Sequence, residues 1–181
     1  VPRIKYKDAI TKYGCDKPDL RIPLELEDIS ELMKNEEFKV FSGPANDSKA
    51  RVVALRVPGA AELTRKKIDE YTDFVGKLGA KGLAYIKVVA LEEENGLQSP
   101  ILKFLDPATI NSVTTALKVE NGDMIFFGAG NANVVNLSMS SLIKKLADDL
   151  DLYESEWAPC WIVDFPMFER TKENKLTSLH H

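Results

Sequence analysis

The sequence is poor in the residues that most often build compact chemical sites, with two cysteines and two histidines among 181 residues. Cys15 and Cys160 have neither the spacing of a zinc site nor the paired framework of a disulfide-stabilised secreted domain. No apolar run approaches the roughly 20 residues that a membrane helix needs. The N-terminus also lacks the hydrophobic region of a signal peptide. These absences favour a cytoplasmic protein with reduced thiols.

A strong charge of one sign is missing as well. The 24 Lys and Arg residues face 28 Asp and Glu residues, which leaves a formal net charge of −4. Because sequence-independent binding to nucleic acid depends on a surplus of cations facing phosphate, strong binding of this kind is not expected from the chain alone. A hydrophobic content of 44% is typical of a globular protein. The length allows one domain with a substantial core and flanking segments.

The central part, residues 36–152, carries the patterns of an α+β domain. Thr64 and Asp106 can cap helices, and apolar residues recur at helical spacing after each of them and again after Gly130. Strands are predicted at residues 38–41, 51–57, 83–89, 101–105 and 124–127. This order predicts two layers, an antiparallel or mixed sheet with helices on one face.

Residues 1–35 and 153–181 have a different texture and are interpreted as flanks. A short helix is predicted at residues 5–13, ended by Gly14, and another at residues 28–34. Residues 157–168 predict a buried strand broken by prolines, which a polar hairpin follows at residues 169–175. We expect the flanks to be two ends of another structure, so that the chain is a piece of a larger protein.

Residues 13–21, with the sequence YGCDKPDLR, combine a glycine, a proline and four charged side chains. Such a composition excludes a regular helix or strand and predicts a fixed polar turn. Its charged residues are expected to find partners, some of them in residues 157–169. Lys12 and Lys17 would favour the thiolate of Cys15. Because no histidine or second cysteine is near in sequence, however, Cys15 is interpreted as an incidental small residue.

Three further features invite a functional interpretation. The glycines of residues 128–130 suggest a phosphate loop, but they lack the third glycine of a dinucleotide fingerprint and the Gly-Lys-Ser/Thr of a P-loop, so a tight strand-to-helix turn is favoured. The basic run of residues 65–67 is interpreted as a solvated face, with an RNA backbone contact as the alternative. Asp164 lies in an apolar segment and needs a partner, for which Arg3 and Arg21 are the candidates.

His180 and His181 are interpreted as a native pair rather than part of a purification tag, and such a pair could hold a substrate carboxylate. The sequence contains no nucleophile with its base, no metal-ligand spacing and no paired glutamates at a helical interval. The residues alone therefore predict an α+β domain without catalytic or metal-binding residues of its own.

Six separated motifs resemble bacterial-type aspartyl-tRNA synthetase in that family's order. YGCDKPDLR is similar to the family's YGSDKPDLR, residues 161–169 resemble the strand after its insertion, and residues 179–181 resemble the start of its HHPFT segment. Cys15 stands where the family has serine. Between the flanks, residues 55–59, 79–87 and 122–129 resemble the insertion called the GAD domain.

The resemblance implies an insertion domain of the DCoH-like type at residues 36–152, with pieces of a class II catalytic domain at residues 1–35 and 153–181. The parent enzyme would activate L-aspartate with ATP and magnesium, transfer it to tRNA, and act as a cytoplasmic homodimer. His180, with His181 beside it, would contact aspartate. The family's ATP-binding arginines and magnesium-binding acids have no counterpart here, so the fragment is expected to be inactive. The alternative is a stand-alone module that binds RNA or a protein without catalysis.

Overall fold

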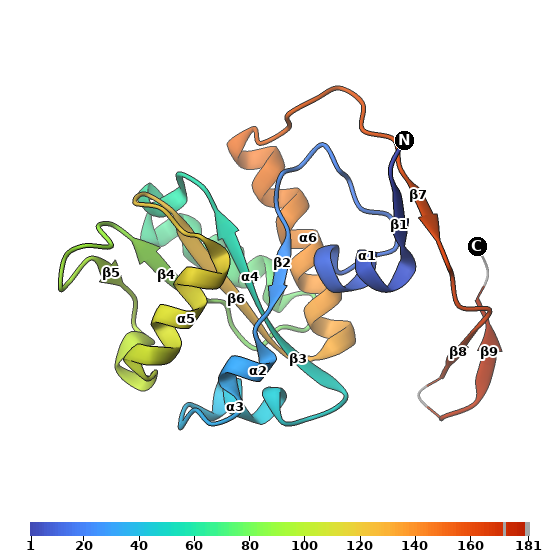
Figure 1. Cartoon of the computed structure of the whole chain (residues 1–181), viewed down its shortest axis with the longest axis horizontal. Coiled ribbons are helices and arrows are strands. Elements are labelled where there is room, and N and C mark those ends of the chain that lie inside the picture. The colour runs from blue at the N-terminus through green and yellow to red at the C-terminus, as the bar shows by residue number, and fades with distance from the viewer. Residues whose placement is uncertain (172, 180–181) are drawn as a thin grey trace.

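The computed structural model describes residues 1–171 and 173–179, and its centre is a five-stranded antiparallel sheet (Figure 1). The strands follow the order β2 (Leu26–Asp28), β3 (Ala50–Val57), β6 (Met124–Asn131), β4 (Ala84–Val88) and β5 (Leu97–Gln98). β3 and β6 pair along their whole length, from Ala50 opposite Asn131 to Val57 opposite Met124. Both are rich in β-branched, aromatic and other apolar residues, which suit a buried pleated surface.

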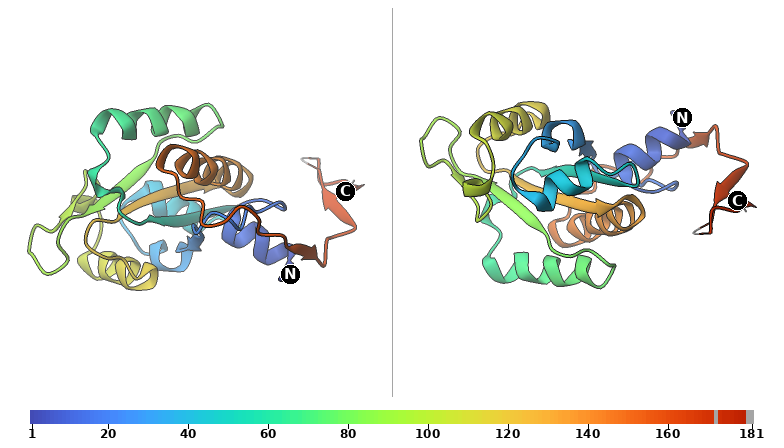
Figure 2. Two further views of the ribbon diagram at one scale, coloured as in Figure 1. Left: turned by 90° about the horizontal axis from the view of Figure 1, so that it is seen from above. Right: turned by 90° about the horizontal axis from the view of Figure 1, so that it is seen from below.

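Helices cover both faces of this sheet, so the predicted two layers with helices on one face are wrong (Figure 2). Val53, Leu55 and Phe126 pack under α4 (Arg65–Gly76) and α6 (Ala132–Leu150). On the opposite face, the residues of β3 and β6 that alternate in sequence with these pack against three helices: α2 (Ser30–Met33), α3 (Lys39–Ala45) and α5 (Pro107–Leu117). The reason is that residues 52–55 and 124–127 are apolar at every position, and a continuous apolar run indicates a strand buried on both faces.

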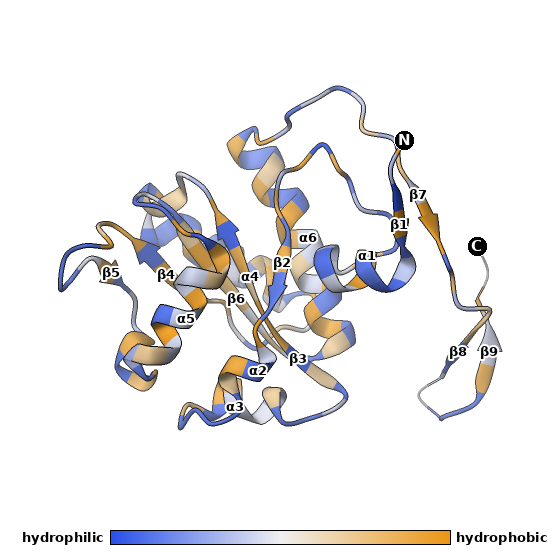
Figure 3. Cartoon of the chain, in the orientation of Figure 1, coloured by the Kyte–Doolittle hydropathy of each residue, from blue (hydrophilic) through white to orange (hydrophobic). Residues whose placement is uncertain are grey.

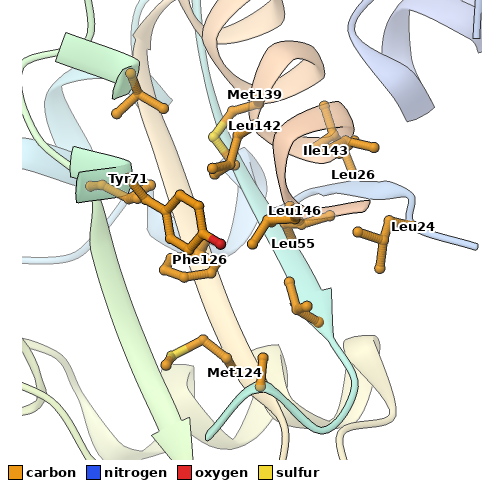
Figure 4. Close-up of a cluster of buried hydrophobic side chains, with 14 of the residues drawn as sticks. Leu24, Leu26, Leu55, Tyr71, Met124, Phe126, Met139, Leu142, Ile143 and Leu146 are labelled. Atoms are coloured by element: carbon orange, nitrogen blue, oxygen red, sulfur yellow. The ribbon is translucent and has the colours of Figure 1, made fainter. Parts of the chain in front are cut away.

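The core on the α6 side is the larger of the two clusters (Figure 4). Met139, Leu142 and Leu146 project from α6 towards Leu55 and the neighbouring strand. The ring of Tyr71, from α4, meets Phe126 edge-on with the ring centres 6.3 Å apart. These buried side chains fix α4 and α6 on one face of the sheet.

Local start and stop signals place one end each of α4, α5 and α1 as expected. The Thr64 side chain accepts a hydrogen bond from the Lys67 N–H, and Asp106 accepts one from Ala108, with Pro107 in the first turn of α5. In the N-terminal flank, α1 (Tyr6–Tyr13) ends at Gly14, whose φ of 70° is the left-handed conformation that glycine adopts without strain. The predicted capping by Thr64, Asp106 and Gly14 is confirmed.

Three predicted elements are wrong. Residues 38–41, predicted as a strand, lead into α3, because Phe38 and Phe41 lie at helical spacing and their rings meet edge-on at 5.0 Å. Residues 101–105 contain a 3-10 helix, η2 (Leu102–Phe104), and the strand is β5 instead. Residues 128–131, predicted as a turn, are part of a strand, because their pairing with β3 continues to the end of β6.

A further 3-10 helix, η1 (Ala60–Glu62), follows β3.

The flanks meet beside the domain rather than within it. β1 (Arg3–Lys5) pairs in parallel with β7 (Trp161–Val163), and β8 (Phe168–Arg170) forms an antiparallel hairpin with β9 (Leu176–Ser178). The predicted hairpin is confirmed, but the predicted burial of residues 157–168 is wrong. Trp157 is 85% exposed and Trp161 is 63% exposed, because no described element packs over them. Figure 3 shows hydrophobic residues on β7, away from the sheet domain.

The division of the chain at residues 35 and 152 remains a prediction. Residues that it assigns to the N-terminal flank contribute to both cores of the sheet domain: Ile22, Leu24 and Leu26 on the α6 side, and Ile29 and Met33 on the other. Within residues 1–171 and 173–179, no helix is long and apolar enough to cross a membrane.

Candidate functional site

An open cleft of about 710 Å³ separates the turn at residues 13–21 from α6. The turn forms one wall and the second half of α6 forms the other, with Phe74 of α4 at the side. The residues that line it are Tyr13, Cys15, Lys17, Pro18, Asp19, Ile22, Phe74, Ser140, Ser141, Ile143, Lys144, Lys145, Asp148 and Asp149. This cleft is where the sequence motif of residues 13–21 meets charged side chains of the sheet domain.

The turn is held by contacts among its own residues and with its neighbours. Arg21 donates from Nε and Nη2 to the two carboxylate oxygens of Asp19, at 2.8 and 2.6 Å. These hydrogen bonds, against the opposing effect of burial, lower the pKa of Asp19. The Arg21 guanidinium also lies 4.9 Å from the centre of the Tyr153 ring. Asp19 and Arg21 thus pair with each other, so the predicted partners in residues 157–169 are wrong for these two; two residues of a tight turn are close enough to pair.

Charged residues of opposite sign pair along α6 on the opposite wall. Lys144 Nζ lies 2.6 Å from Asp148, and Lys145 Nζ lies 3.4 Å from Asp149. Each pair is four residues apart, which puts both members on the same face of the helix. The Tyr153 hydroxyl accepts a hydrogen bond from Lys144 and donates one to Asp148. Hydrogen bonds from Lys144 and Tyr153 lower the pKa of Asp148.

Asp149 joins α6 to α4. The Tyr71 hydroxyl donates to Asp149 at 2.9 Å, and Lys67 Nζ lies 3.2 Å from the same oxygen. Burial opposes ionisation of Asp149, but the hydrogen bonds from Tyr71 and Lys67 outweigh it and lower the pKa of this carboxyl. Burial, followed by the bond to Asp149, raises the pKa of Tyr71. Lysines and aspartates therefore neutralise each other on this wall, which does not suit it to hold a polyanion.

The remaining predicted features of the cleft and its surroundings also have structural explanations. Burial raises the pKa of the Cys15 thiol, against a lowering hydrogen bond from the Lys17 backbone, and this direction disfavours the reactive thiolate. In the basic run of residues 65–67, Arg65 lies 3.6 Å from Asp69, and Lys67 is engaged by Glu70 and Asp149. These pairings favour the solvated face over the RNA contact.

The phosphate-loop interpretation of residues 128–130 is excluded by their place inside β6. Gly128 is needed there for packing, because a Cβ atom would lie 2.7 Å from Met139 Cγ. Asp164 is exposed, and its cation is Lys5 at 3.9 Å, rather than Arg3 or Arg21. The prediction of a buried carboxylate at this position is therefore wrong, because the segment around it is exposed.

The sequence-predicted substrate residues, His180 and His181, lie outside the described residues, so their role stays a prediction. Across the described part of the chain, no group of three or more His, Cys, Asp or Glu side chains could hold a metal ion. The residue that sequence reasoning missed is Arg51, a buried cation of β3. The sequence did indicate this residue, because a charged side chain at the start of an apolar strand needs partners.

Comparison with known families gives one match. The family model described as the GAD domain matches residues 41–139, which is more than half of the chain. This domain is found in aspartyl- and lysyl-tRNA synthetases and related proteins. The matched residues run from α3 to the middle of α6, so they include the central strands of the sheet and leave the turn at residues 13–21 outside.

Proposed function

The chain belongs to the GAD domain family, and we propose on that premise that it is part of an aspartate–tRNA ligase. The parent enzyme, a class II aminoacyl-tRNA synthetase, activates L-aspartate with ATP and magnesium and transfers the aspartyl group to tRNA. The sheet domain is an insertion of the DCoH-like type, and the flanks are segments of the catalytic domain. The parent acts as a homodimer in the cytoplasm.

The observation that carries this proposal is the pairing of β1 with β7. Arg3 lies opposite Trp161 and Lys5 opposite Val163, in parallel register. The chain thus leaves for the sheet domain and returns from it at one place, as an insertion requires. Parallel sheets occur almost only where both faces are covered, whereas Trp161 of this pair is exposed. We infer that β1 and β7 belong to a larger sheet of the catalytic domain.

The exposed apolar residues of the C-terminal flank support the same inference. Trp157, Trp161, Met167 and Phe168 are all more than half exposed. Soluble monomers rarely expose large contiguous apolar surfaces, and those that do usually have a partner for them. In the proposal, the rest of the catalytic domain covers these side chains. A stand-alone module would leave them in water, which disfavours that alternative.

The 181-residue chain by itself is expected to be inactive. Adenylate formation needs preorganised cations around the reacting phosphate, and Lys144, Lys145 and Lys67 are each engaged by an aspartate. His180 and His181 are proposed to hold the aspartate substrate in the parent, by resemblance to the family's His-His pair. These two residues alone cannot assemble an active site.

The test is amino-acid-dependent ATP–pyrophosphate exchange by the longer protein that contains this chain. Aspartate is expected to support exchange, while lysine and asparagine are not. Exchange that depends on lysine would contradict the choice of amino acid, since the GAD domain is found in aspartyl- and lysyl-tRNA synthetases. The 181-residue chain is measured in parallel, and exchange by this chain alone would show that the fragment proposal is wrong.

A variant separates the proposed substrate residue from its surroundings. His180→Ala in the longer enzyme is expected to raise the KM for aspartate with a much smaller change in the KM for ATP. Ser178→Ala, two residues away in β9, serves as the matched control and is expected to leave both constants unchanged. Equal effects of the two variants would refute the assignment of His180.

The RNA-binding alternative is tested with the 181-residue chain and tRNA. The paired lysines of α6 and α4 predict no mobility shift even at low salt, because cations already neutralised by carboxylates release few counterions from RNA. A shift that weakens steeply with added salt would favour a binding module over the ligase fragment.

A further inference from the structure

Arg51 is the only buried lysine or arginine among the residues that the structure describes, with 9% of its surface exposed. It lies near the start of β3 and makes contacts in several directions. Its Nε donates to Asp28 Oδ2 at 3.0 Å, and Nη1 donates to Asn136 Oδ1 at 2.8 Å. The guanidinium also donates to two backbone carbonyls of α1, those of Ile10 at 3.4 Å and Thr11 at 3.0 Å.

The two carbonyls belong to the last turn of α1. The final four carbonyls of a helix have no partner within the helix, and this end carries partial negative charge. The Ile10 carbonyl already accepts from the Gly14 N–H at 3.0 Å, so Arg51 adds a second, longer hydrogen bond there. Arg51 also supplies a hydrogen bond to the Thr11 carbonyl and a favourable positive charge at the end of α1. In return, α1 provides part of the compensation without which a buried guanidinium would be strongly destabilising.

Asn136 of α6 lies against both Arg51 and the end of α1. Its side chain accepts from Arg51, and its backbone oxygen would lie 2.6 Å from a Cβ atom placed on Gly14. The absence of that Cβ lets the end of α1 approach the backbone of α6. Ala9 in the middle of α1 is also fully buried. We call Arg51, Asp28, Asn136 and Gly14, together with the carbonyls of Ile10 and Thr11, the α1 joint.

We propose that Arg51 is a positioning residue, which fixes the orientation of α1 on the sheet domain through the α1 joint. α1 continues directly from β1, which pairs with β7, so both flanks follow the orientation of α1. Resting on the proposed function, the α1 joint sets the angle at which the inserted domain stands on the catalytic domain. The donor lies within the GAD match, whereas the acceptors on α1 are backbone atoms of the flank.

Arg56 provides a matched control on the same strand. Its Nε donates to the buried carboxylate of Asp123 at 2.6 Å. Asp123 follows the turn before β6, so this ion pair lies within the sheet domain. Loss of Arg56 should therefore weaken the domain without acting on α1, whereas loss of Arg51 should act on α1 first.

The experiment is hydrogen–deuterium exchange of the 181-residue chain, comparing peptides from α1 with peptides from β3 and β6. Arg51→Met is expected to raise exchange in α1 roughly tenfold or more, because hydrogen bonds to a charged group are lost from that helix. Arg51→Lys retains the charge but not the fork of donors, and it is expected to restore part of the protection. Arg56→Met is expected to leave exchange in α1 unchanged relative to β3 and β6.

Two results would overturn the proposal. One is that Arg51→Met raises exchange equally in α1 and in β3 and β6. The other is that Arg56→Met raises exchange in α1 but not in β3 and β6. If Arg51→Met does not fold, Gly14→Ala tests the α1 joint from the flank, and unchanged α1 exchange in that variant also refutes it. The measurement needs no enzymatic activity, so its failure leaves the ligase proposal standing, and absence of aspartate-dependent exchange leaves the α1 joint standing.

Discussion

Gly128 offers a direct test of how the sheet packs against α6. A Cβ atom at this position would lie 2.7 Å from Met139 Cγ, 3.0 Å from Met139 Sδ and 3.2 Å from Val53 Cγ2. Both neighbours are buried, so neither can move into solvent. Gly128→Ala therefore forces a methyl group into occupied space, although the flexible side chain of Met139 can give way in part.

The expected magnitude is the balance of two terms. An alanine restricts the unfolded chain more than glycine does, which stabilises the fold by about 0.5–1 kcal/mol where the backbone conformation is compatible. Overpacking of a tight core costs about 1–3 kcal/mol. With mid-range values for both terms, the substitution is expected to lower the free energy of unfolding by about 1.3 kcal/mol. With a typical urea dependence, the midpoint should fall by roughly 0.6 M.

The assay is urea unfolding followed by circular dichroism, with Gly76→Ala as the control. Gly76 is the exposed last residue of α4, where an added Cβ meets no atom within 4 Å. The same substitution there is expected to raise stability, because alanine favours the helix over glycine. A lower midpoint for the first variant and a higher one for the second would separate steric crowding from the general effect of replacing glycine.

A double variant tests the cause more sharply. Met139→Ala alone should destabilise by about 2–5 kcal/mol, because it leaves a cavity in the core. In the double variant, the methyl group at position 128 partly fills that cavity, so the combined loss should be smaller than the sum of the two single losses. Strict additivity, or a Gly128→Ala variant as stable as the wild type, would refute the packing argument.

Four further outcomes are expected. Because hydrogen bonds lower the pKa of folded Asp149, the stability that its charge provides is present above the unfolded value near 3.9 and is lost as the pH falls through the folded value; the stability advantage of wild type over Asp149→Asn should therefore shrink below about pH 4 in urea titrations. Trp161→Ala should change the stability of this chain by less than about 0.5 kcal/mol, since the ring is largely exposed, and a larger loss by thermal unfolding would argue against that exposure. In a Cys160→Ser background, Cys15 should react with iodoacetamide at pH 8 more slowly than free cysteine, because burial raises its pKa; faster reaction would contradict this. A chain cut to residues 36–152 should be unfolded by circular dichroism, whereas one of residues 20–155 should fold.

The elements that the sequence predicted well are those with local start and stop signals. Thr64 and Asp106 cap their helices through their own side chains, and Gly14 ends α1 through its own backbone conformation. Such signals act within a few residues, so they can be read without knowledge of the fold. The long strand β3 was equally clear, because eight consecutive residues carry few polar groups.

The errors arose where distant residues decide the structure. Residues 128–131 continue as a strand only because β3 supplies hydrogen-bonding partners as far as Ala50. The number of layers depended on helices that reach the second face of the sheet, among them α3, which was predicted as a strand. At the candidate site, the composition of residues 13–21 predicted a fixed polar turn, but only the fold could show that the turn faces α6.

The stability of the sheet domain decides where its boundary lies. Ile22, Leu24, Leu26, Ile29 and Met33 are at most 4% exposed, and each packs in one of the two cores. Burial of such a side chain contributes about 1.5–3 kcal/mol, so the five together contribute roughly 7–15 kcal/mol, which is comparable with the whole stability of an ordinary domain. Their removal would also leave β3 as an edge strand, paired with β6 on one side and without a partner on the other. Residues 36–152 are therefore expected to lack a cooperative thermal transition, and a sharp transition in that shorter chain would show that β2 and α2 are dispensable.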